Sequence, residues 1–434
     1  MNGTRQAIVG ARLLDPASGL DAVGTLLIED GRIADFGPRL FADGVPSGIE
    51  VHDAAGLALA PGLIDMHAFL GEPGREHKET LVTAGEAAAA GGVTTIVATP
   101  NTDPVIDDVA LVEFVQRRAD ETCPVRVRQM AALTRGLKGQ EMTEIGLLRA
   151  AGAVAFTDGD RAVAEARLMR RALAYASTFD AILVQVPEEP SLARDGVMNE
   201  GEMSMRLGLS GIPAMAETIM VERDLRLVEL TGGRLHFSHV STATAVAALG
   251  AARARGLRVS AGAAPHSFAL NETAIGEYRT YCKVSPPLRA EADRLALVAG
   301  IADGTIDVIS SGHRPQDQES KRLPFAQASF GIIGLQTMLP LALELHHNGS
   351  VPLLRLLACM TSRPAGLLGL EAGRLLVGRP ADLVLIDLDR PWIISEREFR
   401  SKTKNSPFDG RPVQGRVMRT LVGGQIAYDR KRDG

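Results

Sequence analysis

The chain has 434 residues and a formal net charge of −5, so it offers no electrostatic basis for binding nucleic acid or an anionic membrane. No apolar run is long enough to span a bilayer, and the first residues lack the regions of a signal peptide. Cys123, Cys282 and Cys359 form no CxxC pair, which indicates reduced thiols. The sequence therefore predicts a cytoplasmic protein with neither nucleic acid nor membrane among its partners.

Short strand patterns occupy both ends of the chain. Before the middle of the chain they are residues 7–14, 24–29, 32–36 and 56–60, with Asp30-Gly31 as a hairpin turn. Near the other end they are residues 382–387, 417–422 and 425–428, with Gly423-Gly424 as a turn. We expect residues 1–60 and 375–434 to assemble one small β-sandwich domain from both ends.

Between these blocks, strand and helix patterns alternate eight times. The expected strands are residues 63–70, 94–99, 125–133, 153–158, 181–186, 234–240, 258–263 and 307–312. Helical patterns follow most of them, for example at residues 163–177, 214–230, 243–255 and 292–302. Eight alternations are the number required to close an α/β barrel of the TIM-like (β/α)8 type, which we assign to residues 61–374.

The stretch at residues 63–104 places polar side chains where the first barrel strand ends. An apolar pair, Leu63-Ile64, leads into Asp65 and His67, and a turn rich in Gly and Pro follows. Barrel enzymes carry their functional side chains at the carboxyl ends of the strands. Two histidines spaced His-x-His would point to one metal ion, because the side-chain period of a strand is two. Here Phe69 stands at the second position.

Several segments together resemble the dihydroorotases of the amidohydrolase superfamily. The matching segments are PGLIDMHAFLGEPG, KET, GGVTTIVATPNT, FTDGD (156–160), EEPSL (188–192), GVMNEG (196–201), HFSHVST (236–242), KVSPPLR (283–289), FGIIGLQTMLPL (330–341) and GRPADLVLID (378–387). They cover nearly the whole chain in the expected order. The resemblance implies the barrel and the composite β domain, and it implies hydrolysis of a cyclic amide at a zinc site.

The resemblance also implies a set of metal ligands and a general base, of which half is missing. Three positions keep the expected kind of residue: His67, Asp158 at the bridging position and His239. Three have lost it: Phe69 and Val186 stand where histidines are implied, and Gly312 stands where the catalytic Asp is implied. Two protein ligands per metal ion are too few for a dependable zinc site. We therefore expect no catalytic residue and no cofactor, and any bound metal would have to use His67, Asp158 and His239.

The implied substrate pocket is eroded as well. Asn101 and His266 remain, whereas Gly71 replaces the Arg that would hold the substrate carboxylate and Ser285 replaces an Asn. An ionised Asp158 without a metal needs a partner, so we expect it to share a hydrogen bond with His67 or His239. Three further histidines, His77, His266 and His313, lie on loops at the functional face and are candidates for substitute ligands.

These observations favour a dihydroorotase-like protein of pyrimidine biosynthesis that has lost catalysis. It resembles the non-catalytic dihydroorotase homologues that associate with aspartate transcarbamoylase, which implies that enzyme as a partner and a homo-oligomer. The alternative is an active zinc-dependent dihydroorotase, or a related cyclic amidohydrolase, with a rebuilt metal site. A metal-free binding protein for a pyrimidine precursor is a third hypothesis, which the glycine at position 71 disfavours.

Overall fold

The computed structural model describes residues 5–433, and its centre is a barrel of eight parallel strands. In chain order they are β6 (Leu63–Ala68), β7 (Val93–Ala98), β8 (Arg126–Ala132), β9 (Ala155–Thr157), β10 (Ile182–Gln185), β13 (Arg234–Phe237), β14 (Val259–Ala263) and β15 (Val308–Ile309). Each pairs with the next, so the order in space follows the order in the chain. Seven of the eight lie within the strands predicted from the sequence, β7 begins one residue earlier than predicted, and the predicted fold class is confirmed.

The first and last barrel strands, β6 and β15, share no regular ladder of backbone hydrogen bonds. Side chains and loops join them instead. The Asp65 carboxylate on β6 accepts hydrogen bonds from the backbone N–H of Ser311, at 2.9 Å, and from the Ser311 hydroxyl. The backbone N–H of Phe69 donates to the carbonyl of His313 at 2.9 Å. Burial raises the pKa of Asp65. These contacts bring the loop after β15 directly against β6, next to the candidate site.

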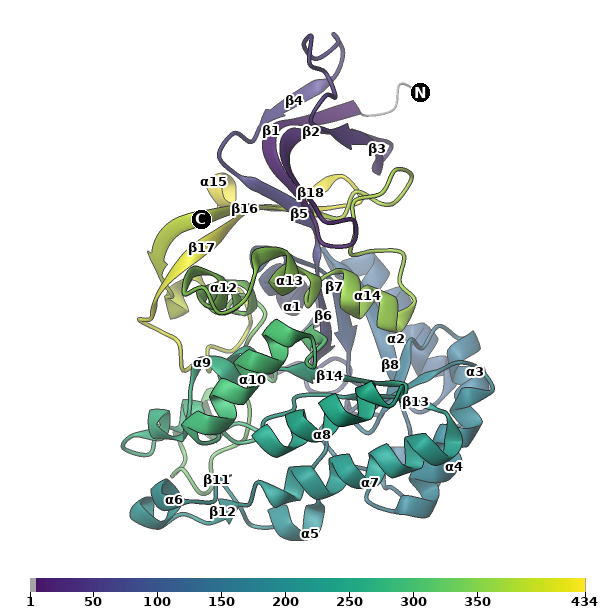
Figure 1. Ribbon diagram of the computed structural model, residues 1–434, viewed down its shortest axis with the longest axis vertical. Coiled ribbons are helices and arrows are strands. Elements are labelled where there is room, and N and C mark those ends of the chain that lie inside the picture. The colour runs from purple at the N-terminus through teal and green to yellow at the C-terminus, as the bar shows by residue number, and fades with distance from the viewer. Residues whose placement is uncertain (1–4, 434) are drawn as a thin grey trace.

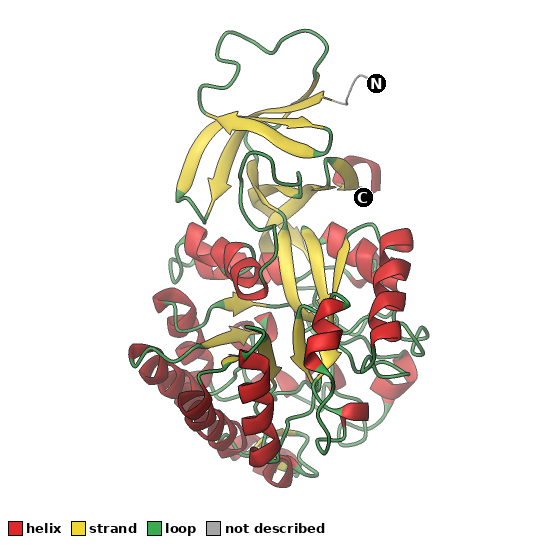
Figure 2. Ribbon diagram, turned by 90° about the vertical axis from the view of Figure 1, so that its right-hand side faces the viewer, coloured by secondary structure: helices red, strands yellow, loops and turns green. Residues whose placement is uncertain are grey.

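Helices cover the outside of the barrel (Figure 2). The main ones are α1 (Leu81–Ala90), α2 (Val109–Thr122), α4 (Ala166–Ser177), α7 (Met215–Thr231), α8 (Ala243–Ala254), α10 (Glu291–Asp303) and α12 (Met338–His347). Several begin at side-chain caps: Thr242, for example, accepts a hydrogen bond from the N–H of Ala245 at the start of α8. Within residues 5–433, no helix combines the length and the apolar character needed to cross a membrane.

Both chain ends build a second sheet, which stands beyond one end of the barrel (Figure 1). Its order is β18 (Gln425–Asp429), β17 (Pro412–Val422), β16 (Leu383–Ile393), β5 (Ala58–Pro61), β1 (Arg5–Asp15), β2 (Leu20–Glu29) and β3 (Arg32–Gly37), with β4 (Glu50–Asp53) on β1. The pairing of β5 with β16 joins the two chain ends. The domain limits given above, residues 1–60 with 375–434 for the β domain and 61–374 for the barrel, stay a prediction.

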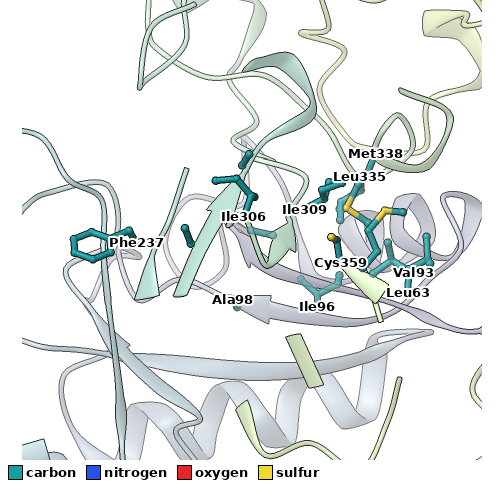
Figure 3. Close-up of a cluster of buried hydrophobic side chains, with 14 of the residues drawn as sticks. Leu63, Val93, Ile96, Ala98, Phe237, Ile306, Ile309, Leu335, Met338 and Cys359 are labelled. Atoms are coloured by element: carbon teal, nitrogen blue, oxygen red, sulfur yellow. The ribbon is translucent and has the colours of Figure 1, made fainter. Parts of the chain in front are cut away.

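Apolar side chains fill the space on both faces of the barrel strands. On the outer face, Ile96 and Ile309 lie in one buried cluster with Met338 of α12 and Cys359 (Figure 3). Inside the barrel, apolar side chains from five strands pack against α14 (Ser362–Leu368): Ile64, Met66, Val97, Met130, Ile182, Val184, Val308, Ala365 and Leu368. The barrel interior is therefore closed on this side, and polar chemistry is confined to the opposite strand ends.

Candidate functional site

The residues that the sequence singles out gather at the carboxyl ends of the barrel strands, around a cavity of about 40 Å³. This inner cavity is lined in part by the expected positions His67, Phe69, Asn101, Val186, His239, His266, Ser285 and Gly312. Asp158 and Gly71 are not among its lining residues. One water molecule occupies about 10–15 Å³ of such space, so the inner cavity holds only a few waters.

His67 is a partly buried, neutral imidazole that shares a hydrogen bond with a serine. The register of β6 against β7 shifts between Asp65 and Ala68, and this irregularity sets the direction of the His67 side chain. His67 Nδ1 shares a hydrogen bond of 3.0 Å with the hydroxyl of Ser238. Burial lowers the pKa of His67 to about 4, so the ring carries no charge at neutral pH.

His239 lies edge-on against His67, with the two ring centroids 4.6 Å apart. Its backbone has a φ of 54°, a left-handed conformation at the turn that follows β13. His239 Nε2 shares a hydrogen bond of 3.1 Å with the Ser310 hydroxyl, and burial holds the pKa of His239 well below its usual range. Each of these two imidazoles therefore has a neutral hydroxyl partner in the place where the resemblance implies a metal ion.

Asp158 does not bond to either histidine, so that prediction from the sequence is wrong. The Asp158 carboxylate accepts hydrogen bonds from the backbone N–H of Thr134, at 2.8 Å, and from the Thr134 hydroxyl. Burial raises the pKa of Asp158 to about 6, against the opposing effect of these hydrogen bonds. Thr134 on the loop after β8 thus takes the role that we expected of an imidazole, and it directs the carboxylate away from the inner cavity lining.

The two positions at which glycine replaces an implied side chain have no space for one. Gly312 has a φ of 63°, and a Cβ atom there would lie 2.9 Å from His266 Cε1 and 3.2 Å from Ala264 Cβ. Gly71 has a φ of 76°, and a Cβ atom there would lie 2.5 Å from the carbonyl oxygen of Glu79. The surrounding loops have closed over both positions, so neither is a pocket waiting for a missing side chain.

Two of the three candidate substitute ligands, His266 and His313, line the inner cavity, and His77 lies outside it. His77 is exposed on the loop after β6. His266 is buried, and neither of its ring nitrogens has a hydrogen-bond partner. His313 Nδ1 accepts from the N–H of Gly334 at 3.2 Å, and its Nε2 lies 3.3 Å from the buried carboxylate of Glu79. Across residues 5–433, no group of three or more His, Cys, Asp or Glu side chains is arranged to hold a metal ion. The residues present therefore do not fit the implied zinc.

Two residues that the sequence analysis missed separate the inner cavity from the solvent. Arg314, on the loop after β15, forms an ion pair with Asp160, on the loop after β9, and Asn101 Nδ2 donates to Asp160 Oδ1 at 3.2 Å. Phe69 and these three residues line both the inner cavity and a larger outer cleft of about 430 Å³. The sequence does contain a signal for this pair. Asp160 stands two positions after Asp158, and Arg314 stands two positions after Gly312, and both of these are expected site positions.

Several residues of the matching segments lie outside the cavity and have packing roles. The buried Glu217 carboxylate on α7 accepts hydrogen bonds from the N–H groups of Ser241, at 2.9 Å, and Thr242, at 2.8 Å, and from both hydroxyls. Arg289 Nε donates to the Ser241 hydroxyl at 3.1 Å. The segment that follows His239 is thereby fixed to α7 and to the KVSPPLR segment.

Comparison with known proteins agrees with the fold and the motifs. A family model described as Dihydro-orotase-like matches residues 56–245, and one described as Amidohydrolase family matches residues 213–427. The dihydroorotase of Wolbachia sp. subsp. Brugia malayi (strain TRS) is 44% identical over 427 residues, covering 98% of this chain and 96% of that protein. The dihydroorotase of Syntrophotalea carbinolica is 44% identical over 421 residues, covering 97% of this chain and 98% of that protein.

A solved structure with the same architecture is the L-hydantoinase (dihydropyrimidinase) from Arthrobacter aurescens. It superimposes with a TM-score of 0.87 at 25% sequence identity, covering 98% of this chain and 96% of that chain. The dihydropyrimidinase from Brevibacillus agri has a TM-score of 0.85 at 22% identity and covers 98% of this chain and 95% of that chain, a likeness of fold alone.

Proposed function

Because this chain belongs to the dihydroorotase family, we propose that it is a dihydroorotase homologue of pyrimidine biosynthesis that does not hydrolyse dihydroorotate. The observation that carries the proposal is the set of side chains that surround the implied ligand positions. Ser238 and Ser310 each share a hydrogen bond with one ring nitrogen of His67 and His239, respectively, Thr134 donates to Asp158, and Phe69 and Val186 stand at two other implied ligand positions.

Hydrolysis of a cyclic amide at neutral pH needs an activated water and a base. A zinc ion supplies the first by lowering the pKa of a bound water, and residues 5–433 contain no group of three or more His, Cys, Asp or Glu side chains arranged to hold one. The base would be a carboxylate at position 312, where this chain has a glycine. Burial keeps His67 and His239 neutral, and although both line the inner cavity, one ring nitrogen of each shares a hydrogen bond with a hydroxyl.

The role that replaces catalysis in this proposal is support of an oligomeric assembly in the cytoplasm, with aspartate transcarbamoylase as the partner. The partner rests on the resemblance to non-catalytic dihydroorotase homologues. Its support from the molecule is indirect: the barrel and its retained motifs are intact as a packed scaffold, although the site is not.

Co-assembly is tested by mixing the purified chain with aspartate transcarbamoylase from the same organism. Size-exclusion chromatography with light scattering would give the mass of each protein alone and of the mixture. We expect a complex of fixed stoichiometry that contains more than one copy of this chain. Elution of both proteins at their separate masses, at micromolar concentrations, would contradict the assembly role.

A second candidate function, active dihydroorotase, is favoured by a specific observation. The relatives reported above carry that name and are 44% identical to this chain over nearly its full length. This hypothesis requires a metal site that differs from the arrangement of the side chains described here. Turnover of dihydroorotate to carbamoyl aspartate by the purified chain with added zinc, abolished by a chelator, would establish it and overturn the first proposal.

A further inference from the structure

The outer cleft contains a surplus of positive charge that the proposed function does not use. Four cationic side chains line it, Arg75, Lys78, Arg161 and Arg314, and they face a single carboxylate, Asp160. We propose that the outer cleft binds a small anion with two or more negative charges, such as a phosphate ester or a polycarboxylate. This inference goes beyond the proposed function and does not rest on it, because binding there requires neither metal nor catalysis.

The cations come from separate loops that the barrel brings together. Arg75 and Lys78 lie on the loop after β6, Arg161 on the loop after β9, and Arg314 on the loop after β15. In open and closed α/β folds, ligands bind at the carboxyl ends of the strands, where such loops converge. The volume of about 430 Å³ lies within the range of roughly 300–1,000 Å³ that small-molecule sites occupy.

Most of this positive charge lacks a carboxylate partner within the molecule. Arg314 is paired with Asp160, and Lys78 Nζ donates to the neutral side-chain oxygen of Gln316 at 2.7 Å. Neither Arg75 nor Arg161 forms an ion pair with any carboxylate of residues 5–433. Three cations are thus left for a ligand, and two of them are guanidinium groups, which bind phosphate or carboxylate oxygens in a bidentate manner.

The cations also repel one another, and an anion would relieve that repulsion. Burial lowers the pKa of Lys78, and the charges of Arg75 and Arg314 lower it further, whereas the carboxylates of Asp317 and Asp160 raise it. Concentrating like charge in a concave site is costly unless a counter-ion binds there. The chain as a whole has a net charge of −5, so the positive potential is local to this cleft and suits a small ligand rather than a nucleic acid.

The floor of the outer cleft limits what can enter. Phe69, Asn101 and the Asp160–Arg314 pair close it toward the inner cavity, and Phe330 lies on the wall. A ligand held by the four cations would therefore stay above His67 and His239. The outer cleft is a binding site whose occupant is separated from the histidines of the inner cavity.

Isothermal titration calorimetry with the intact protein tests this inference directly. Inorganic pyrophosphate and citrate would be titrated separately, with acetate as a monovalent control and the ionic strength held constant, since salt screens such interactions. We expect pyrophosphate or citrate to bind one per chain and to raise the melting temperature, and acetate to do neither. Tighter binding of pyrophosphate would indicate a phosphorylated ligand, and tighter binding of citrate a polycarboxylate.

Charge-removing variants identify the site. In Arg75→Gln/Arg161→Gln, both changes are on exposed side chains without ion pairs, so the fold should persist. We expect the affinity for the preferred anion to fall about a hundredfold, roughly tenfold for each guanidinium lost, because hydrogen bonds between charged groups are stronger than neutral ones. The matched control, Arg167→Gln/Arg170→Gln, removes two exposed cations from α4 outside the cleft and should bind as the wild type does.

Two results would overturn the inference. One is the absence of binding by both pyrophosphate and citrate at millimolar concentration to a folded wild-type protein. The other is equal affinity of the wild type and of the Arg75→Gln/Arg161→Gln variant, with the variant melting at the wild-type temperature in the absence of ligand. Neither readout depends on turnover or on a partner enzyme, so failure here is distinct from failure of the proposed function.

Discussion

The ion pair between Arg314 and Asp160 joins the loop after the eighth barrel strand to the loop after the fourth and divides the barrel mouth in two. Below it lies the inner cavity of about 40 Å³ with its neutral histidines, and above it the outer cleft of about 430 Å³. Family chemistry would take place below this pair, in a space that holds only a few water molecules. The pair thus separates the inner cavity with its histidines from the cationic outer cleft.

Replacing Gly312 with alanine should destabilise the protein more than the same replacement at a left-handed glycine that has open space around it. The expected loss is roughly 2–4 kcal/mol, because the alanine must adopt a φ of 63° and its Cβ would lie 2.9 Å from His266 Cε1. The free energy of unfolding from urea titration measures the loss.

Gly349→Ala is the matched control for the backbone conformation. Gly349 has a φ of 78° and no atom within 4 Å of an added Cβ, so that variant should lose about 1 kcal/mol, from backbone strain alone. Equal losses in the two variants would mean that the space at Gly312 is open, contrary to the closed site described above.

Glu217→Ala should be among the most destabilising single substitutions on α7. It removes a buried carboxylate and leaves the N–H groups and hydroxyls of Ser241 and Thr242 without an acceptor, at an expected cost of roughly 3–5 kcal/mol. Glu222→Ala changes an exposed glutamate on the same helix and should cost less than about 0.5 kcal/mol. Thermal unfolding compares them, and a small effect at Glu217 would contradict its assigned role in fixing the segment after β13.

The buried His266 should make the protein sensitive to acid. Burial lowers its pKa to about 4, below the unfolded value of roughly 6.5. Between these values the unfolded chain binds a proton that the folded chain excludes, so the free energy of unfolding falls as the pH falls through this window and is constant above it. His266→Phe should flatten this dependence by about 1.4 kcal/mol per pH unit near pH 5.

Asp158 has the opposite effect on the free energy of unfolding within part of this pH window. Its pKa is raised to about 6 in the folded state, so below that pH the folded chain holds a proton that the unfolded chain has lost. Comparison of the wild type with His266→Phe removes this contribution, since both carry Asp158. His347→Gln, at an exposed position, should leave the slope unchanged. An unchanged slope in His266→Phe would show that His266 is not held neutral.

The fold could be predicted almost completely because periodic patterns determine it. All eight barrel strands and most of the sheet from both chain ends follow from alternating and continuous apolar runs. The strands missed within the described residues are the short pair Met198–Asn199 and Gly211–Ile212 and, in the sheet from both chain ends, Glu50–Asp53. That strand has no apolar alternation and is placed by pairing with β1. Its register depends on a distant segment, which local pattern does not reveal.

The site could be predicted in its members but not in its hydrogen bonds. Most of the expected positions line one cavity, because barrel topology brings the strand ends together. The partner of Asp158 could not be foreseen, because Thr134 lies on a different loop and nothing in its own segment marks it. Arg314 and Asp160 each stand two positions after an expected site position, but their pairing could not be foreseen, because it depends on how two loops meet over the cavity.

Restoring the two missing imidazoles should restore metal binding. Phe69→His/Val186→His would add two ligands beside His67 and His239, which reaches the number that zinc requires. We expect the variant to retain about one zinc ion per chain after gel filtration, measured by mass spectrometry of the metal. Phe114→His/Val82→His, with both changes at exposed positions on α2 and α1, should retain none. A folded but metal-free variant at the site would mean that the loss involves more than the missing histidines.

The most direct test of the central claim is the zinc content of the purified wild-type protein, measured with dihydroorotate turnover in the same preparation after zinc is added. The side chains around His67, Asp158 and His239 predict no stoichiometric zinc and no formation of carbamoyl aspartate. About one zinc ion per chain together with turnover that a chelator removes would contradict this account and identify the protein as an active dihydroorotase.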